Sequence, residues 1–306
     1  MQVIRTRKMG FCFGVRRAYE LVEKLAKEND ERPLMISGPL VHNTKVIDRI
    51  SGMGVAVSEN AEEIKGARVV IRTHGTTKEN YEKLLAQNEE VHDATCCIVN
   101  DVRYSALELL ERHPVVIIVG KKKHPEIIGL ISWLDGRYHV VEHPEDLESL
   151  PHYPSVGVVS QTTFAPGKFE QYCSALKERY PEVEVVDTIC PHTSKNQDAS
   201  RWTAKLVDVM LIVGDEHSSN SKTLYTECAK VNPRCYFIQG PDDIEEAWLA
   251  EVDSTAKPAP DKETASKGNA RADYDPKKLA VGITAGASTP DWVIDAIEAR
   301  LNEFSA

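Results

Sequence analysis

Short runs of apolar, mainly β-branched residues recur along the chain, and each ends in a polar loop that leads into an amphipathic stretch. One set of runs ends in glycine and lies at 34–38, 115–120 and 209–214. A second set ends in small hydroxyl residues and lies at 69–77, 156–163 and 281–289. Continuous apolar runs bounded in this way are typical of strands buried on both faces of a parallel sheet.

Helical periodicity separates these runs, and the alternation of strand and helix predicts βα units. The clearest helical stretches lie at 16–27, 80–87, 168–180 and 291–301. In such sheets ligands bind beyond the carboxyl ends of the strands, so the polar loops are the expected place for a site. The sequence therefore predicts an α/β fold with parallel sheets.

Three cysteines occupy matching places in this pattern. Cys96 and Cys190 each follow a short strand and an Asp-x-x-Cys sequence and precede an amphipathic helix, and Cys12 also precedes one. They are 84 and 94 residues apart, about the size of a small α/β unit. We therefore expect three thiols that meet on one axis. The three pseudo-equivalent units are expected at 13–96, 97–190 and 191–306, joined by the N-terminal segment 1–12.

One stretch of the third unit breaks the pattern. Residues 252–278 are rich in Ala, Lys, Asp, Ser and Pro and have few apolar anchors. This composition predicts a solvated loop or flexible insertion, to which we assign no function.

Composition and charge narrow the class of protein. The 306 residues are 42% hydrophobic and 27% charged, as in a globular protein with a proper core. The formal net charge of −10 argues against nonspecific nucleic-acid binding, although a locally basic cleft can still bind a small anion. No apolar run approaches the roughly 18 residues of a membrane span, and the N-terminus lacks a signal-peptide pattern. We expect a cytoplasmic protein that binds neither nucleic acid nor membrane.

A cysteine taken alone is more often a small buried hydrophobic residue than a ligand, and we assign Cys173, Cys228 and Cys235 to the core. Cys97 adjoins Cys96, and neighbouring side chains leave the backbone in different directions. We therefore expect only one of these two thiols to face the axis.

The three matching cysteines differ because position, loop and following helix recur together. A helix N-terminus favours the thiolate that a metal needs. Three thiolates with a vacant fourth position favour a catalytic iron–sulfur cluster. Zinc is the main competing metal, but its structural sites usually have close Cys-x-x-Cys pairs, which this sequence lacks.

Hydrogen-bond donors gather in the strand-end loops. A lone histidine is more often a surface or satisfied core residue, yet here histidines, hydroxyls and an amide share this position. Such a set suits phosphate oxygens, and helix N-termini behind the loops add favourable dipoles. Neither a P-loop nor a Gly-x-Gly-x-x-Gly fingerprint is present. The predicted substrate-binding residues are His42, His74, His124, Thr162, Ser218, Ser219, Asn220 and Ser288.

Glu126 is the one carboxylate that the repeat places among these donors. A glutamate is normally a surface residue, but its place beside His124 favours a proton donor. A neighbouring diphosphate helps a carboxylate to keep its proton, because like charges oppose ionisation.

The motifs that carry these residues, in order from about residue 3 to 301, resemble the LytB-type hydroxymethylbutenyl diphosphate reductases. These are the terminal enzymes of the methylerythritol phosphate route to isoprenoids. The motifs are Phe11–Ala18, His42-Asn43, Thr73–Gly75, Asp93–Cys96, His124–Glu126, Gln161–Thr163, Ser218–Ser221 and Thr284–Ser288.

The resemblance implies a trefoil of three α/β units around a central [4Fe-4S] cluster with one open iron, held by Cys12, Cys96 and Cys190. It implies that the open iron binds the allylic hydroxyl, with Thr162 near that hydroxyl and Glu126 delivering protons. Two electrons, from a reduced ferredoxin or flavodoxin-like partner, and two protons then remove the hydroxyl as water. The products are isopentenyl and dimethylallyl diphosphates.

Two other hypotheses stay open at this point. A cluster-dependent hydro-lyase also uses three cysteines and an open iron, but it needs no reductant and is expected to have an arginine collar for carboxylates. A non-catalytic iron–sulfur redox sensor binds the cluster without turnover. The loops offer His, Ser and Asn with Glu126 and Thr162, which favours a phosphate-binding reductase.

Overall fold

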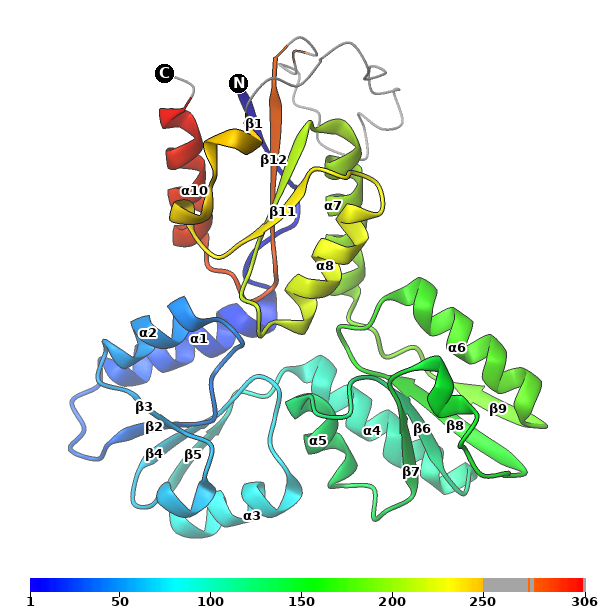
Figure 1. Cartoon of the computed structure of the whole chain (residues 1–306). Helices are drawn as coiled ribbons and strands as arrows, with labels where there is room; N and C mark the ends of the chain where they lie inside the picture. The colour runs from blue at the N-terminus through cyan, green and yellow to red at the C-terminus, as the bar shows by residue number, and fades with distance from the viewer. Residues whose placement is uncertain (250–274, 276–277, 305–306) are drawn as a thin grey trace. The chain divides into compact units, whose positions relative to one another are not determined.

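The computed structural model describes residues 1–249, 275 and 278–304, in which the strands form three four-stranded sheets (Figure 1). Every strand pairing in these sheets is parallel. Sheet A has the order β11 (Cys235–Ile238), β10 (Val209–Val213), β12 (Ala280–Ala285) and β1 (Gln2–Arg5). Sheet B has the order β3 (Ala56–Ser58), β2 (Leu34–Ser37), β4 (Arg68–Ile71) and β5 (Glu90–Asp93). Sheet C has the order β7 (Tyr138–Val141), β6 (Val116–Val119), β8 (Ser155–Ser160) and β9 (Glu182–Val185).

The three sheets share one topology. In each, the first strand is central, the second lies beside it at one edge, the third lies on its other side, and a fourth closes the far edge. In sheet A the fourth place is taken by β1, from the N-terminus of the chain. The predicted fold of three α/β units with parallel sheets is confirmed.

The apolar runs found in the sequence are the central strands of these sheets. All residues of β4, β6, β8, β10 and β12 are buried, as expected for strands covered on both faces. The helices are α1 (Phe13–Ala26), α2 (Thr44–Ser51), α3 (Lys78–Gln87), α4 (Cys97–Arg112), α5 (Pro125–Ile131), α6 (Pro166–Arg179), α7 (Pro191–Leu206), α8 (Ser219–Ala229) and α10 (Asp291–Glu303). The predicted helix at 16–27 begins three residues earlier, directly after Cys12.

Helices cover both faces of sheets A and C. In sheet A, α10 packs on one face, whereas α7 and α8 pack on the other (Figure 1). In sheet C, α6 covers one face, and α4 with α5 covers the opposite face. Sheets A and C are therefore each the middle layer of a three-layer sandwich.

The helix after each matching cysteine covers a different sheet from the strand before it. Helix α4 follows β5 of sheet B but packs on sheet C through Val102, Ala106 and Leu109. Helix α7 follows β9 of sheet C but packs on sheet A, and α1 follows β1 of sheet A but lies with sheet B (Figure 1). Each cysteine consequently sits where the chain passes from one sheet to the next.

The described chain divides into two compact units. Unit 1 contains Met1–Cys12, His42–Val46 and the chain from Pro191 onward, and unit 2 contains Phe13–Val41 and Ile47–Cys190. Unit 1 holds sheet A, and unit 2 holds sheets B and C. The boundaries 13–96, 97–190 and 191–306 stay a prediction. The predicted insertion at 252–278 lies, apart from Asp275 and Lys278, outside the described residues.

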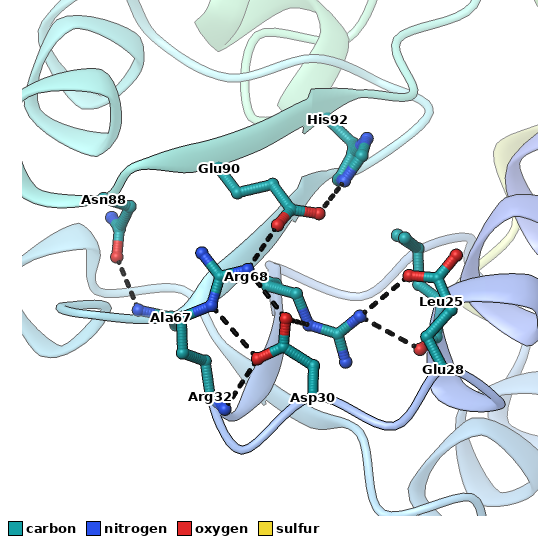
Figure 2. Close-up of polar contacts among 9 residues, drawn as sticks. All are labelled: Leu25, Glu28, Asp30, Arg32, Ala67, Arg68, Asn88, Glu90 and His92. Carbon is teal, nitrogen blue, oxygen red and sulfur yellow. Dashed lines mark hydrogen bonds and ion pairs between the residues drawn. The ribbon is translucent and has the colours of Figure 1, made fainter.

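A polar network fastens the amino ends of β4 and β5 (Figure 2). Buried Arg68 donates to the carbonyl of Leu25 at 3.2 Å and lies 3.1 Å from the carboxylate of Glu28. Arg32 contacts Glu90 at 2.6 Å. These contacts tie α1 to sheet B at the end opposite to the cysteine loops, so they stabilise the unit rather than form the site.

Among the described helices, none combines the length and the apolar character needed to cross a bilayer.

Candidate active site

The three matching cysteines have equivalent backbone surroundings. Each follows the fourth strand of its sheet, and its N–H donates to a carbonyl two positions beyond the end of the third strand. The pairs are Cys12 with Ala287 at 3.2 Å, Cys96 with Thr73 at 3.0 Å, and Cys190 with Thr162 at 2.8 Å. The repeat seen in the sequence therefore extends to individual hydrogen bonds.

The Asp-x-x-Cys sequence forms a turn that directs the cysteine into the helix start. Asp93 accepts a hydrogen bond from the N–H of Thr95 at 2.9 Å, and Asp187 accepts one from Ile189 at 3.0 Å. Carboxylates two residues before a backbone N–H close turns in this way. Before Cys12 the turn is made instead by Gly10 at φ +73°, a left-handed conformation that favours glycine.

The first turn of α1 lies directly against Cys96. A Cβ on Gly14 would stand 2.9 Å from the sulfur of Cys96, which is closer than side-chain carbons normally approach. Arg17 donates to the carbonyl of Thr95 at 2.8 Å and holds the same turn in place. Because a helix N-terminus carries partial positive charge, this contact favours the thiolate of Cys96.

The three cysteines that were assigned to the core are indeed buried. Cys173, Cys228 and Cys235 are buried, and burial raises the pKa of all three thiols, to about 11 for Cys235. Cys97 is exposed whereas Cys96 is half-buried. Which of the two thiols faces the axis stays a prediction.

Unit 1 contains the loop of His42 and two loops of the third repeat. One of these holds Ser218, Ser219 and Asn220, and the other holds Ser288. Ser218 caps α8 by accepting from the N–H of Ser221 at 3.2 Å. Ser288 lies 3.4 Å from the hydroxyl of Ser218 and donates to the carbonyl of His42 at 3.2 Å. Asn220 is only 5% exposed, and neither polar atom of its amide has a hydrogen-bond partner in the described part of the chain. A buried amide of this kind suits a ligand that completes its hydrogen bonds.

Ser221 fixes this loop from behind. It is fully buried and donates to the hydroxyl of Ser218 at 3.0 Å. A Cβ on Gly214 or Gly286 would stand 2.3 or 2.0 Å from its hydroxyl oxygen, so both positions require glycine. The strand-ending glycine of the sequence pattern therefore makes room for the serine that orients Ser218.

Unit 2 contains the imidazoles of His74 and His124, whose rings lie edge to face with centroids 5.5 Å apart. His124 is the N-cap of α5, and its Nδ1 accepts from the N–H of Glu126 at 3.2 Å. The neutral ring therefore carries its proton on Nε2, from which it can donate to an anion. His74 and Glu126 also line one pocket, together with Thr95 and Trp133.

Glu126 is 2% exposed, and Thr162 holds its carboxylate through two hydrogen bonds. The N–H of Thr162 donates to one oxygen at 2.7 Å, and its hydroxyl donates to the other at 2.8 Å. Burial raises the pKa of Glu126, and the hydrogen bonds from Thr162 only partly oppose it, so the pKa is about 7. The carboxyl can therefore hold or release a proton near neutral pH without any bound anion.

The structure thus brings the predicted residues together in two groups. Every predicted loop follows the carboxyl end of a strand, as expected. Unit 1 holds Cys12, His42, Ser218, Ser219, Asn220 and Ser288, and unit 2 holds His74, Cys96, His124, Glu126, Thr162 and Cys190. The convergence of both groups on one axis stays a prediction.

Three supporting residues were not identified from the sequence: Gly14, Asp215 and Ser221. Gly14 and Ser221 lie inside the motifs Phe11–Ala18 and Ser218–Ser221, so the motifs themselves could have indicated them. Asp215, which follows β10, accepts from the N–H of Thr44 at 2.8 Å, and these residues are 171 positions apart in the chain, so no local pattern indicates the pair.

Comparison with known proteins identifies the family. The model of the family described as LytB protein matches residues 3–302. The chain belongs to the LytB family.

Curated relatives of this LytB chain match it over nearly its whole length. The 4-hydroxy-3-methylbut-2-enyl diphosphate reductase of Geobacter sulfurreducens is 34% identical, covering 99% of this chain and 98% of its own. The enzyme of the same name from Caldanaerobacter subterraneus is 35% identical, with the same coverage. A solved structure of (E)-4-hydroxy-3-methyl-but-2-enyl diphosphate reductase, the terminal enzyme of the non-mevalonate pathway, is 33% identical with a TM-score of 0.69, covering 99% of this chain and 100% of its own.

The corresponding reductase from Plasmodium falciparum is 24% identical, with a TM-score of 0.83, covering 99% of this chain and 88% of its own, and supports the fold. LytB-type enzymes are iron–sulfur proteins, and this chain has the cysteines that such a centre needs.

Proposed function

We propose that this LytB chain reduces (E)-4-hydroxy-3-methylbut-2-enyl diphosphate to isopentenyl and dimethylallyl diphosphates. The observation that carries the proposal is the buried Glu126–Thr162 pair beside His124, in a chain whose full-length relatives are named for this reaction. A buried carboxyl with a pKa near 7 and two fixed donors is suited to proton delivery.

The donor set fits a [4Fe-4S] cluster held by Cys12, Cys96 and Cys190. These thiols share one local geometry at helix starts, whereas three of the other four are buried among apolar side chains with raised pKa values. Such a cluster, with one iron open, supplies electrons and a Lewis-acid position for the hydroxyl oxygen.

The residues of the chain bind the diphosphate and control the proton. His42, Ser218, Ser219, Asn220 and Ser288 in unit 1, with His74 and His124 in unit 2, are the proposed donors to phosphate oxygens. In His124 the proposed donor is Nε2–H, because its Nδ1 accepts from the N–H of Glu126. Donors that the fold already holds in place need little further reorganisation when the anion binds.

The reaction balances with two electrons and two protons. The carbon–oxygen bond breaks, one proton leaves with the hydroxyl as water, and a second forms the new carbon–hydrogen bond. We propose that protonated Glu126 supplies the proton that turns hydroxide, a poor leaving group, into water, and that Thr162 orients both the carboxyl and the hydroxyl. A reduced ferredoxin or flavodoxin-like protein is the proposed electron donor. The cytoplasm is the proposed compartment, because seven cysteines without a disulfide framework suit a reducing environment.

Turnover of the substrate under anaerobic conditions tests the proposal. Protein reconstituted with iron and sulfide should be brown, contain about four irons, as a [4Fe-4S] cluster requires, and form both products when supplied with dithionite and a viologen mediator. The same protein without reductant is the control. Product formation without reductant would favour a hydro-lyase, and cluster-loaded protein that binds the substrate without turnover would favour a sensor.

A further inference from the structure

We propose that Asp215 is a positioning residue that fastens the loop of His42 to the loop of Ser218, Ser219 and Asn220. The inference deepens the proposed function, and it rests on that function for the identity of the ligand. It concerns contacts within unit 1 alone.

The loop of His42 belongs to a different unit from the chain around it. Residues His42–Val46 fall in unit 1, whereas the segments on either side, Phe13–Val41 and Ile47–Cys190, fall in unit 2. A five-residue stretch that leaves its own sheet requires specific contacts to hold it. Those contacts determine where the imidazole of His42 stands relative to the proposed phosphate donors of unit 1.

Asp215 makes the most direct of these contacts. It follows β10 and Gly214, and it is 3% exposed. One carboxylate oxygen accepts from the N–H of Thr44 at 2.8 Å and also from the Thr44 hydroxyl. The other oxygen accepts from the N–H of His217 at 2.8 Å. A single carboxylate thus bonds both loops, one through each oxygen.

A further hydrogen bond holds the same loop on unit 1. Ser288 donates to the carbonyl of His42 at 3.2 Å. This bond is longer than those of Asp215, and its donor is a proposed ligand of the substrate. Asp215 is therefore the residue that holds the loop without itself being needed for the diphosphate.

The charge of Asp215 also has an explanation. A carboxylate near an anion site is unfavourable unless its oxygens are satisfied. Burial acts to raise the pKa of Asp215, but hydrogen bonds from Thr44 and His217 outweigh it and bring the pKa below its ordinary value. An amide of the same shape has one acceptor oxygen, so it cannot accept from both loops, and its NH₂ group would face a donor.

The experiment compares Asp215→Asn with a matched control, Asp208→Asn. Asp208 is also buried in unit 1 and accepts from the N–H of Ala280 at 2.8 Å, but at the amino end of the same sheet. Inorganic pyrophosphate is the probe, and its Kd is measured by calorimetry on the cluster-loaded full chain. We expect the Kd to rise about tenfold in Asp215→Asn and to stay unchanged in Asp208→Asn, as for coupling through a shared contact.

Variants of Thr44 test the same hydrogen bonds from the side of the donor. Thr44→Val removes the hydroxyl donor and should raise the Kd about threefold, whereas Thr44→Ser keeps it and should bind as the wild type does. The double variant that combines Thr44→Val with Asp215→Asn should bind pyrophosphate no more weakly than Asp215→Asn alone, because the two residues share one interaction. Hydrogen exchange at the Thr44 amide should accelerate in Asp215→Asn, and KM for the diphosphate substrate should rise with little change in kcat.

The outcomes separate this inference from the proposed function. Unchanged pyrophosphate affinity and unchanged exchange at Thr44 in Asp215→Asn would overturn the inference, as would an equal loss of affinity in Asp208→Asn. If wild-type protein shows no reductase turnover while its pyrophosphate affinity still depends on Asp215, the positioning role stands and the proposed reaction fails.

Discussion

Glu126 shows how one residue obtains its chemistry from its surroundings. From its place beside His124, the sequence predicts that Glu126 is a proton donor. A neighbouring diphosphate then explains why the carboxyl keeps its proton. The structure shows that no ligand is needed for this, because burial raises the pKa of Glu126 to about 7. Burial could not be deduced because it depends on α5, β8 and the chain between them.

Replacing Glu126 with Gln should lower kcat about 100-fold, because the amide has no proton to give. In the wild type, kcat/KM should fall as the pH rises above about 7, where the carboxyl of the substrate-free protein ionises. The variant's residual activity should lack this decline. Steady-state rates between pH 6 and pH 9 measure both effects, and comparable activity in the variant would remove Glu126 from the mechanism.

The same pKa predicts a change in stability. Because the pKa of Glu126 is raised on folding from 4.5 to about 7, the folded state keeps a proton that the unfolded state releases in this range. The stabilisation is complete below pH 4.5 and is lost as the pH rises through 7. Between these values the wild type should lose about 3 kcal/mol of unfolding free energy relative to Glu126→Gln.

Urea unfolding at pH 5 and pH 8 measures this difference. Glu20→Gln, a change at an exposed carboxylate on α1, is the control and should follow the wild type. A constant difference between wild type and Glu126→Gln across this range would show that the carboxyl ionises normally in the folded protein.

At the scale of elements, the sequence predicted most strands and helices but not what their ends contact. The apolar runs are the central strands because burial on both faces leaves a pattern that is readable locally. The start of α1 was placed three residues late, because nothing in Phe13-Gly14-Val15 reveals that Cys96 packs there. Contacts between residues distant in the chain leave no periodicity.

Gly14→Ala tests whether the close approach of α1 to Cys96 matters. The added Cβ would stand 2.9 Å from the sulfur, so the sulfur or the helix must move. We expect iron incorporation after reconstitution to fall below about half, since misplacing one ligand weakens a site that uses three.

The matched control is Gly167→Ala. Gly167 is likewise the second residue of a helix, α6, but a Cβ there meets nothing within 4 Å. This variant should retain wild-type iron and gain slightly in stability, because alanine favours a helix more than glycine does. Equal iron content in both variants would show that α1 does not constrain Cys96.

For the whole molecule, the repeat of cysteine, loop and helix predicted the three sheets because each copy is contiguous enough to be recognised. The sequence predicts the role of the N-terminal segment less completely. Segment 1–12 was expected to join the units, but its strand β1 also fills the fourth place of sheet A, next to a strand that begins at residue 280. This strand order requires a pairing between the two ends of the chain, and no local sequence pattern indicates such a pairing.

The cysteine set is the property of the whole molecule on which the proposed cluster depends, since its members follow strands of three different sheets. Cys12→Ser, Cys96→Ser and Cys190→Ser should each lose most of the iron and the brown colour, because a cubane held by two thiolates dissociates readily. Cys97→Ser is the sharpest control, since it changes an exposed thiol next to Cys96, and it should keep iron, colour and turnover. Iron analysis and absorption spectra after anaerobic reconstitution measure the outcome. If Cys97→Ser lost the cluster and Cys96→Ser kept it, the shared backbone geometry of Cys12, Cys96 and Cys190 would not be what selects the ligands.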